Sequence, residues 1–113
     1  MHFNVQDKYF KLISEGKKTA EGRIYKPKLH YLKPGDIITF SPNSDATSIL
    51  HGKVKYVNVY ADFKDMLEAG ELEHLLPDVH EIQKGVSIYE KFGSYKEDQF
   101  TYGVASIGFS LAK

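Results

Sequence analysis

Two long segments of this chain alternate residue by residue, and this alternation restricts the possible fold more than any other feature. The first runs from Ser48 to Ala61 and the second from Phe100 to Leu111. The second places Tyr102, Val104, Ser106 and Gly108 on one face and Gly103, Ala105, Ile107 and Phe109 on the other. Because successive side chains of a strand point to opposite faces, both segments are predicted to be strands.

The first of these strands is predicted to change register along its length. Leu50 and Val54 stand at even positions, whereas Val57 and Val59 stand at odd positions. An unbroken strand would put the two pairs on opposite faces. A bend or bulge is expected near Gly52, since glycine is common at such irregularities.

Shorter elements fill the rest of the chain. Strands are predicted over His2–Val5, Thr19–Tyr25 and Ile37–Phe40, and helices over Asp7–Glu15, Asp62–Gly70 and Val79–Phe92, with a short segment Leu72–Leu76 that stops before Pro77. Asp7 and Asp62 are candidate N-caps, and Gly16 is a natural helix stop. Lys26–Lys33 and Gly93–Asp98 are predicted loops, and Lys33–Asp36 has the sequence of a type II turn.

The order of these elements predicts the fold class. About five or six strands with about three helices inserted among them do not alternate strictly, which argues against a doubly wound parallel sheet. We expect an α+β fold with a small, partly closed β-barrel, formed by residues 1–113 as a single domain.

Charge is balanced overall but not along the chain, since fifteen basic and fifteen acidic residues give a net charge of zero. Residues 17–33 hold Lys17, Lys18, Arg23, Lys26, Lys28 and Lys33 against Glu21 alone, and residues 62–81 hold seven acidic residues against Lys64 alone. The basic segment is where an anionic ligand is expected.

Other features narrow the chemistry. The absence of cysteine excludes disulfides, thiolate catalysis and cysteine zinc sites. His74 and His80 lack a neighbouring ligand cluster, so we expect no metal and no other cofactor. With no signal peptide or apolar membrane span, a cytoplasmic location is expected.

The segment Gly16–Arg23 lies at a predicted helix-to-strand junction and is the candidate site. Glu21 and Arg23 share one strand face, and Lys18 joins them if it lies in the turn after Gly16. Arg and Lys can hold a phosphate or a carbonyl oxygen, and Glu21 can orient a base amino group or act as a general base. The alternative is a solvated strand face with weak ion pairs.

This segment resembles the G-x-K-x-x-E-x-R signature of ASCH domains (activating-signal-cointegrator-1 homology), which resemble PUA domains. Similar matches are found in the segments 32–40, 57–67 and 102–107, so the resemblance covers nearly the whole chain. It implies a PUA-like mixed or antiparallel β-barrel with flanking helices, beside which Lys18, Glu21 and Arg23 line a cleft.

The resemblance implies an RNA-binding or nucleotide-binding module. In this hypothesis Lys18, Arg23, Lys26 and Lys28 meet phosphates, and Tyr25 or Tyr60 stacks on a base. The oligomeric state is expected to be a monomer or a weak dimer.

A hydrolase is the alternative that the resemblance implies. Some small ASCH proteins are amidohydrolases of N4-acetylcytidine that use a lysine, a threonine and a downstream glutamate, and others are suggested nucleases. Here Lys18 matches the lysine, but Glu21 occupies the threonine position and Thr19 lies two residues early. Glu71, Glu73 and Glu81 are candidates for the downstream glutamate.

Overall fold

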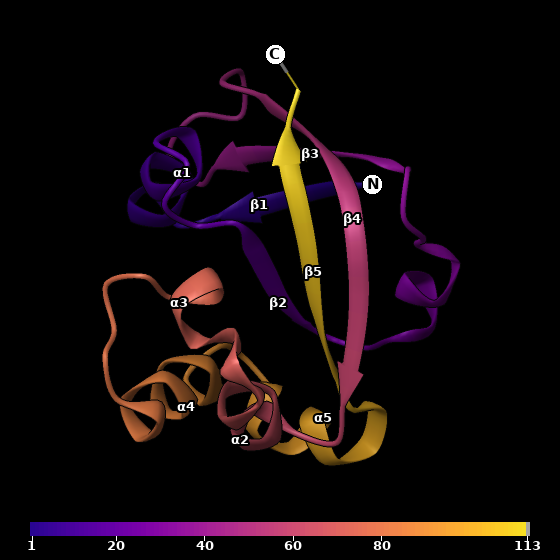
Figure 1. The fold of residues 1–113 in the computed structure, drawn as a ribbon, viewed down its shortest axis with the longest axis vertical. Coiled ribbons are helices and arrows are strands. Elements are labelled where there is room, and N and C mark those ends of the chain that lie inside the picture. Colours follow the sequence, from indigo (N-terminus) through magenta and orange to yellow (C-terminus); the bar gives the residue numbers. More distant parts are fainter. Residues whose placement is uncertain (113) are drawn as a thin grey trace.

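A five-stranded sheet with the strand order β1-β3-β4-β5-β2 forms the frame of the molecule (Figure 1). The computed structural model describes residues 1–112. The strands are β1 (His2–Val5), β2 (Ala20–Ile24), β3 (Ile37–Pro42), β4 (Leu50–Tyr60) and β5 (Val104–Leu111). β1 pairs with β3 in parallel, and the other neighbouring strands are antiparallel. The predicted α+β class is confirmed, with a mixed sheet that forms a half-barrel.

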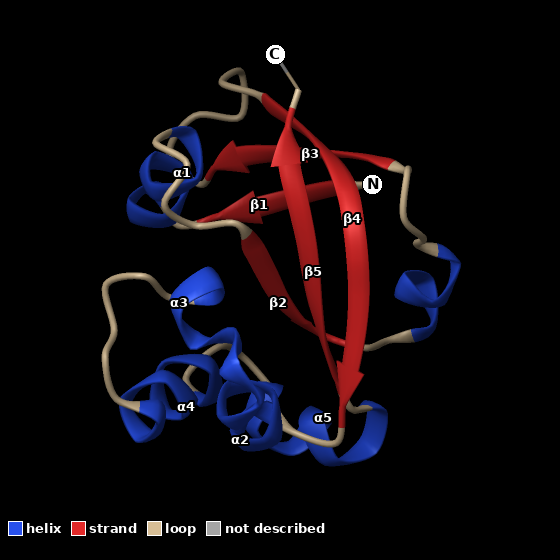
Figure 2. Cartoon of the chain, in the orientation of Figure 1, coloured by secondary structure: helices blue, strands red, loops and turns tan. Residues whose placement is uncertain are grey.

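Most helices gather at one end of this sheet (Figure 2). The helical elements are α1 (Asp7–Ser14), a 3₁₀ turn η1 (Pro27–Tyr31), α2 (Phe63–Met66), a π turn η2 (Leu67–Glu71), α3 (Leu72–Leu75), α4 (Ile82–Glu90) and α5 (Tyr95–Tyr102). The elements from α2 to α5 form one cluster, while α1 lies apart from them. None of these helices has the length and apolar character needed to cross a bilayer.

The register change predicted in the long strand is present. Val54 pairs with Phe109, but two residues later Tyr56 pairs with Gly108, so β4 carries a bulge at this point. Gly52 is not the cause, because it keeps regular pairing with Ile38 on β3. The bulge turns the second half of β4 so that its apolar positions change parity.

The prediction for residues 93–102 is wrong. These residues were expected to form a loop followed by the start of the last strand, but α5 covers Tyr95–Tyr102 and β5 begins at Val104. Gly103 separates the two with a φ of +74°, a left-handed conformation that glycine adopts easily. The alternating pattern from Phe100 onward gave a wrong start for the last strand, because Phe100 is 72% exposed and belongs to no buried strand face.

Smaller corrections concern the ends of elements. Asp7 is the first residue of α1 rather than its N-cap, and its Oδ1 accepts a hydrogen bond from the Ser44 amide. β2 begins at Ala20, so Thr19 lies outside the strand. The segment expected to be a loop after β2 contains the η1 turn.

The two edge strands, β1 and β2, approach each other across the open side of the half-barrel. Arg23 on β2 donates from Nη2 to the backbone oxygen of Asn4 on β1, at 2.8 Å. Its Cζ lies 4.9 Å from the centre of the Phe3 ring. This opening, narrowed by one side chain, is where the candidate site lies.

Candidate functional site

The turn at the end of α1 orients Lys18, the first charged residue of the candidate site. Gly16 has a φ of +77°, and the amides of Lys17 and Lys18 both donate to the Leu12 carbonyl. This cap satisfies a carbonyl at the helix end and turns the chain back toward the sheet. As a result the Lys18 side chain points inward and is only 2% exposed, with its Nζ donating to the Leu75 carbonyl.

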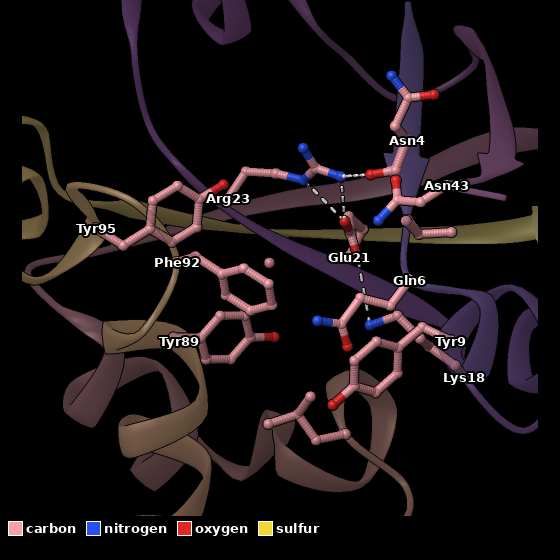
Figure 3. Close-up of a pocket in the computed structure, with 13 residues that line it drawn as sticks. Asn4, Gln6, Tyr9, Lys18, Glu21, Arg23, Asn43, Tyr89, Phe92 and Tyr95 are labelled. Carbon is pink, nitrogen blue, oxygen red and sulfur yellow. Dashed lines mark hydrogen bonds and ion pairs between the residues drawn. The ribbon is translucent and has the colours of Figure 1, made fainter.

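Lys18, Glu21 and Arg23 form a connected group of charges (Figure 3). Glu21 Oε1 lies 3.3 Å from Lys18 Nζ, and Glu21 Oε2 accepts from Arg23 Nε at 2.8 Å and from Nη2 at 2.7 Å. The Glu21 side chain is 10% exposed. The structure thus brings together the three signature residues that were expected to converge, and their role in binding stays a prediction.

Burial and ion pairing act against each other on the pKa values of this group. Burial raises the pKa of Glu21, but the charges of Lys18 and Arg23 outweigh it and leave this pKa below its ordinary value. For Lys18, burial lowers the pKa more than Glu21 raises it. Glu21 is therefore an anion at neutral pH, and a weak proton acceptor.

These charges lie in a cavity of about 180 Å³. Its walls differ in chemistry. Aromatic rings come from Tyr9, Tyr89, Phe92 and Tyr95, and amide side chains from Asn4, Gln6 and Asn43. Among the described residues, Glu21 is the only carboxylate that lines this cavity. In Figure 3 the rings of Tyr89, Phe92 and Tyr95 face the side of the cavity that carries Glu21 and the amides.

The Tyr89 hydroxyl is the unusual group in this cavity. It is buried, and within residues 1–112 its oxygen has no hydrogen-bond partner. The ring is held by stacking on Phe63, with 4.5 Å between centroids. Gly22 leaves room for it, because a Cβ at this position would lie 2.6 Å from the hydroxyl oxygen. Burial also raises the pKa of Tyr89 well above its ordinary value, so the hydroxyl keeps its proton.

The other four predicted binding residues do not line the cavity. The Tyr25 ring packs on His30, with 4.3 Å between centroids. The Tyr60 hydroxyl donates a hydrogen bond to Glu71 Oε2 at 2.8 Å. The pKa of Tyr60 is raised to about 12, mainly by burial and secondly by this hydrogen bond. Lys26 and Lys28 line a neighbouring hollow. The cavity thus contains Lys18, Glu21 and Arg23, the three residues expected to line a cleft, while Tyr25, Lys26, Lys28 and Tyr60 lie outside it, and their part in binding stays a prediction.

Of the residues considered for a hydrolase, Lys18 and Glu21 line the cavity, but Thr19 and the candidate downstream glutamates lie elsewhere. Thr19 directs its hydroxyl to His74 Nδ1, at 3.1 Å, on the other side of Lys18. The three candidates for a downstream glutamate make other contacts. Glu71 accepts from Tyr56, Asn58, Tyr60 and Ser106, Glu73 pairs with His74, and Glu81 pairs with Lys84. None of them lines the cavity.

Sequence reasoning missed the aromatic and amide walls. From the sequence, Tyr9, Tyr89 and Phe92 at helical positions are more typical of a hydrophobic core than of a stacking surface, and Tyr95 falls in the predicted loop Gly93–Asp98. The core assignment holds for part of each ring, because Tyr9 and Tyr89 are also members of the buried apolar cluster. The amides of β1 and of the loop after β3 gave no signal, since their proximity depends on the parallel pairing of these two strands.

Within residues 1–112, no three His, Asp or Glu side chains gather in a group that could hold a metal ion. His74 makes its contacts with Thr19 and Glu73 instead.

Comparison with known proteins gives a family match. A model of the ASCH domain matches residues 3–111. The crystal structure of the hypothetical protein PH0355 is 40% identical, with a TM-score of 0.85, and the match covers 98% of this chain and 97% of that one. The solution NMR structure of PF0455 from Pyrococcus furiosus is 35% identical, with a TM-score of 0.75, over 100% of this chain and 99% of that one.

A more distant structure shows likeness of fold alone. The crystal structure of ASCH from Zymomonas mobilis is 14% identical, with a TM-score of 0.66, over 96% of this chain and 65% of that one. No curated protein matches the chain.

Proposed function

Since this chain belongs to the ASCH domain family, whose fold is PUA-like, we propose that its cavity binds one base of a nucleotide or of a single-stranded RNA. The module binds this ligand without converting it. Lys18, Glu21 and Arg23 form the charged side of the site, and the aromatic rings form the other side.

The buried Tyr89 hydroxyl is the observation that carries this proposal. A buried donor without an acceptor costs about 1–3 kcal/mol, and a ligand that offers an acceptor recovers this energy. Ring nitrogens and carbonyl oxygens of a base are such acceptors. The anionic Glu21 faces the same space and accepts from an amino or imino group of the base.

The shape and the walls of the cavity support a single base. Its volume of about 180 Å³ lies below the roughly 300–1,000 Å³ that is typical of sites for drug-sized ligands. Aromatic side chains stack on bases with about 1–3 kcal/mol per base. An oligonucleotide therefore places one base inside, while its neighbours lie on the outer surface.

The test is an NMR titration of ¹⁵N-labelled protein with the four common nucleosides, their monophosphates and a short single-stranded RNA. Tyr89→Phe removes only the hydroxyl, and Tyr31→Phe is the matched control because Tyr31 is 84% exposed and does not line the cavity. Losing one hydrogen bond to the ligand weakens binding about three- to tenfold. The stability of Tyr89→Phe is retained or increased, because the unpartnered hydroxyl is gone.

Unchanged affinity of Tyr89→Phe would contradict the proposal. So would chemical-shift changes that avoid Lys18, Glu21 and Tyr89.

A hydrolase acting on an N-acylated nucleoside is the second candidate. The small volume of the cavity and the lowered pKa of Lys18 favour it, since a buried lysine more readily supplies a neutral amine. In this reaction water adds across the acyl C–N bond and yields a free acid and an amine. The lowered pKa of Glu21 argues against a general base at this position. Incubation with N4-acetylcytidine, followed by detection of acetate, distinguishes the two functions.

A further inference from the structure

A second hollow of about 130 Å³ adjoins the base cavity and has a different chemical character. Arg23 and Tyr95 line both spaces, so they form the wall that the two have in common. On the far side of this wall lie His2, Lys26 and Lys28. A ligand that extends from one space to the other passes directly along the Arg23 guanidinium and the Tyr95 ring.

The charge in this second hollow, which we name the basic hollow, is positive and only partly compensated. Arg23, Lys26 and Lys28 line it together with His2, and no acidic side chain does so among the described residues. Arg23 is paired with Glu21 on its other side. Lys26 Nζ lies 3.7 Å from Asp98 Oδ2, which offsets part of its charge. Within residues 1–112, Lys28 forms no ion pair. A concave surface lined by one sign of charge concentrates ions of the opposite sign.

Arg23 is placed to contribute to both spaces. Nε and Nη2 contact Glu21 and the Asn4 carbonyl, which fixes the guanidinium plane over the Phe3 ring. In Figure 3 the other terminal nitrogen points away from Glu21, and no dashed line leaves it. Guanidinium groups bind phosphate oxygens through charge-assisted hydrogen bonds, so this nitrogen suits an anion beside the wall.

From these observations we propose that the ligand is a nucleoside monophosphate, or a phosphate-bearing end of RNA, whose phosphate occupies the basic hollow. This inference rests on the proposed function, because it needs the base in the adjoining cavity. It narrows the ligand class, since an uncharged nucleoside fills only one of the two spaces. The sugar then lies against Arg23 and Tyr95.

Isothermal titration calorimetry at low salt tests this assignment with cytidine, adenosine, their 5′- and 3′-monophosphates, and inorganic phosphate. We expect at least one monophosphate to bind about tenfold or more tightly than its nucleoside, the gain from one or two charge-assisted hydrogen bonds. The double variant Lys26→Ala/Lys28→Ala removes this gain and leaves nucleoside binding unchanged. Lys53→Ala/Lys91→Ala is the charge-matched control, because both lysines are exposed and line neither space.

The outcomes separate this inference from the proposed function. Equal binding of nucleosides and monophosphates, still sensitive to Tyr89→Phe, overturns the phosphate site and leaves the base cavity in place. Binding of inorganic phosphate with no binding of any nucleoside or nucleotide overturns the proposal that one ligand occupies both spaces. If the Lys26→Ala/Lys28→Ala variant still binds a monophosphate more tightly than its nucleoside, the phosphate lies outside the basic hollow, which also overturns the inference.

Discussion

Glu21 contacts a different cation with each of its oxygens, Lys18 through Oε1 and Arg23 through Oε2. The carboxylate therefore neutralises two positive charges that burial has removed from water. Breaking a buried ion pair from one side costs about 3–5 kcal/mol, because the remaining charge keeps its desolvation penalty. At this position the loss leaves Lys18 and Arg23 facing each other.

Acid should therefore destabilise the protein through Glu21. Its folded-state pKa is lowered, so the unfolded state binds the proton more readily, and its stabilisation is present above the ordinary carboxyl pKa. This stabilisation is lost as the pH falls from about 5 toward about 2. Glu21→Gln should lower the free energy of unfolding by about 3–5 kcal/mol at pH 7 and flatten its decline in this range, measured by urea denaturation.

Glu97→Gln is the control for this experiment, since Glu97 is exposed on the first turn of α5. It should change the unfolding free energy by no more than about 0.5 kcal/mol. Equal acid sensitivity of the wild type and Glu21→Gln would show that other carboxyl groups govern acid unfolding.

At the residue scale, sequence reasoning predicts local sites better than distant ones. The proximity of Lys18, Glu21 and Arg23 follows from strand spacing and a glycine turn, both of which are local. Tyr89 and Asn43 reach the same cavity from elements far along the chain, and no spacing rule links them to Glu21. Tyr60 looked suited to stacking, but its hydroxyl is directed to the buried Glu71.

At the scale of elements, the bulge in β4 links the sheet to the helical cluster. After the bulge Tyr56 lies opposite Gly108, and its hydroxyl donates to Glu71 Oε1 at 3.1 Å. Glu71 belongs to η2, the turn that leads into α3. Leu75, the last residue of α3, supplies the carbonyl that receives Lys18. The bulge in β4 is thus connected to the candidate site through two hydrogen bonds, from Tyr56 to Glu71 and from Lys18 to the Leu75 carbonyl.

Gly108→Ala should destabilise the protein by about 1–3 kcal/mol, the usual range for overpacking. A Cβ at this position overlaps the Tyr56 ring, which the Glu71 contact holds in place. Gly52→Ala is the matched control in the same sheet, since its Cβ would lie 3.4 Å from the nearest atom, in Phe40. Thermal unfolding followed by circular dichroism compares the two. Similar midpoints would mean that Tyr56 has room to move.

Sequence patterns predict some element boundaries in this chain and fail at others. The parity change in the long strand was predictable, because buried strands leave a regular trace. The π turn and α5 were not, because Gly70 has a left-handed φ of +94° within a helical segment and the apolar residues of α5 are partly exposed. Such segments form where tertiary contacts outweigh local preference.

At the scale of the whole molecule, the half-barrel is open between β1 and β2, and Arg23 spans the opening. β1 pairs with β3 on one side only, so its other edge depends on the contacts of Arg23 with Asn4 and Phe3. A lysine at this position ends in a single nitrogen, so it cannot reproduce the planar fork through which Arg23 contacts Glu21 with Nε and Nη2 and the Asn4 carbonyl with Nη2.

Arg23→Lys should therefore speed amide hydrogen exchange in β1 while leaving β5 unchanged. The residues Val104–Phe109 are all buried and provide an internal reference within the same sample. Hydrogen exchange followed by NMR resolves the two strands. Uniformly faster exchange in both would instead indicate a loss of global stability, as expected if Arg23 held the entire fold rather than one edge.

The strand order also has a consequence for how the chain reaches this structure during synthesis. β2 pairs only with β5, so the backbone groups of Ala20 cannot form their sheet hydrogen bonds until Gly108 has been synthesised. Pairings between such distant residues slow folding, because a long loop must close before they form. Until β5 has left the ribosome, the signature segment is an unpaired strand open to aggregation, and synthesis through β5 is a precondition for a finished cavity.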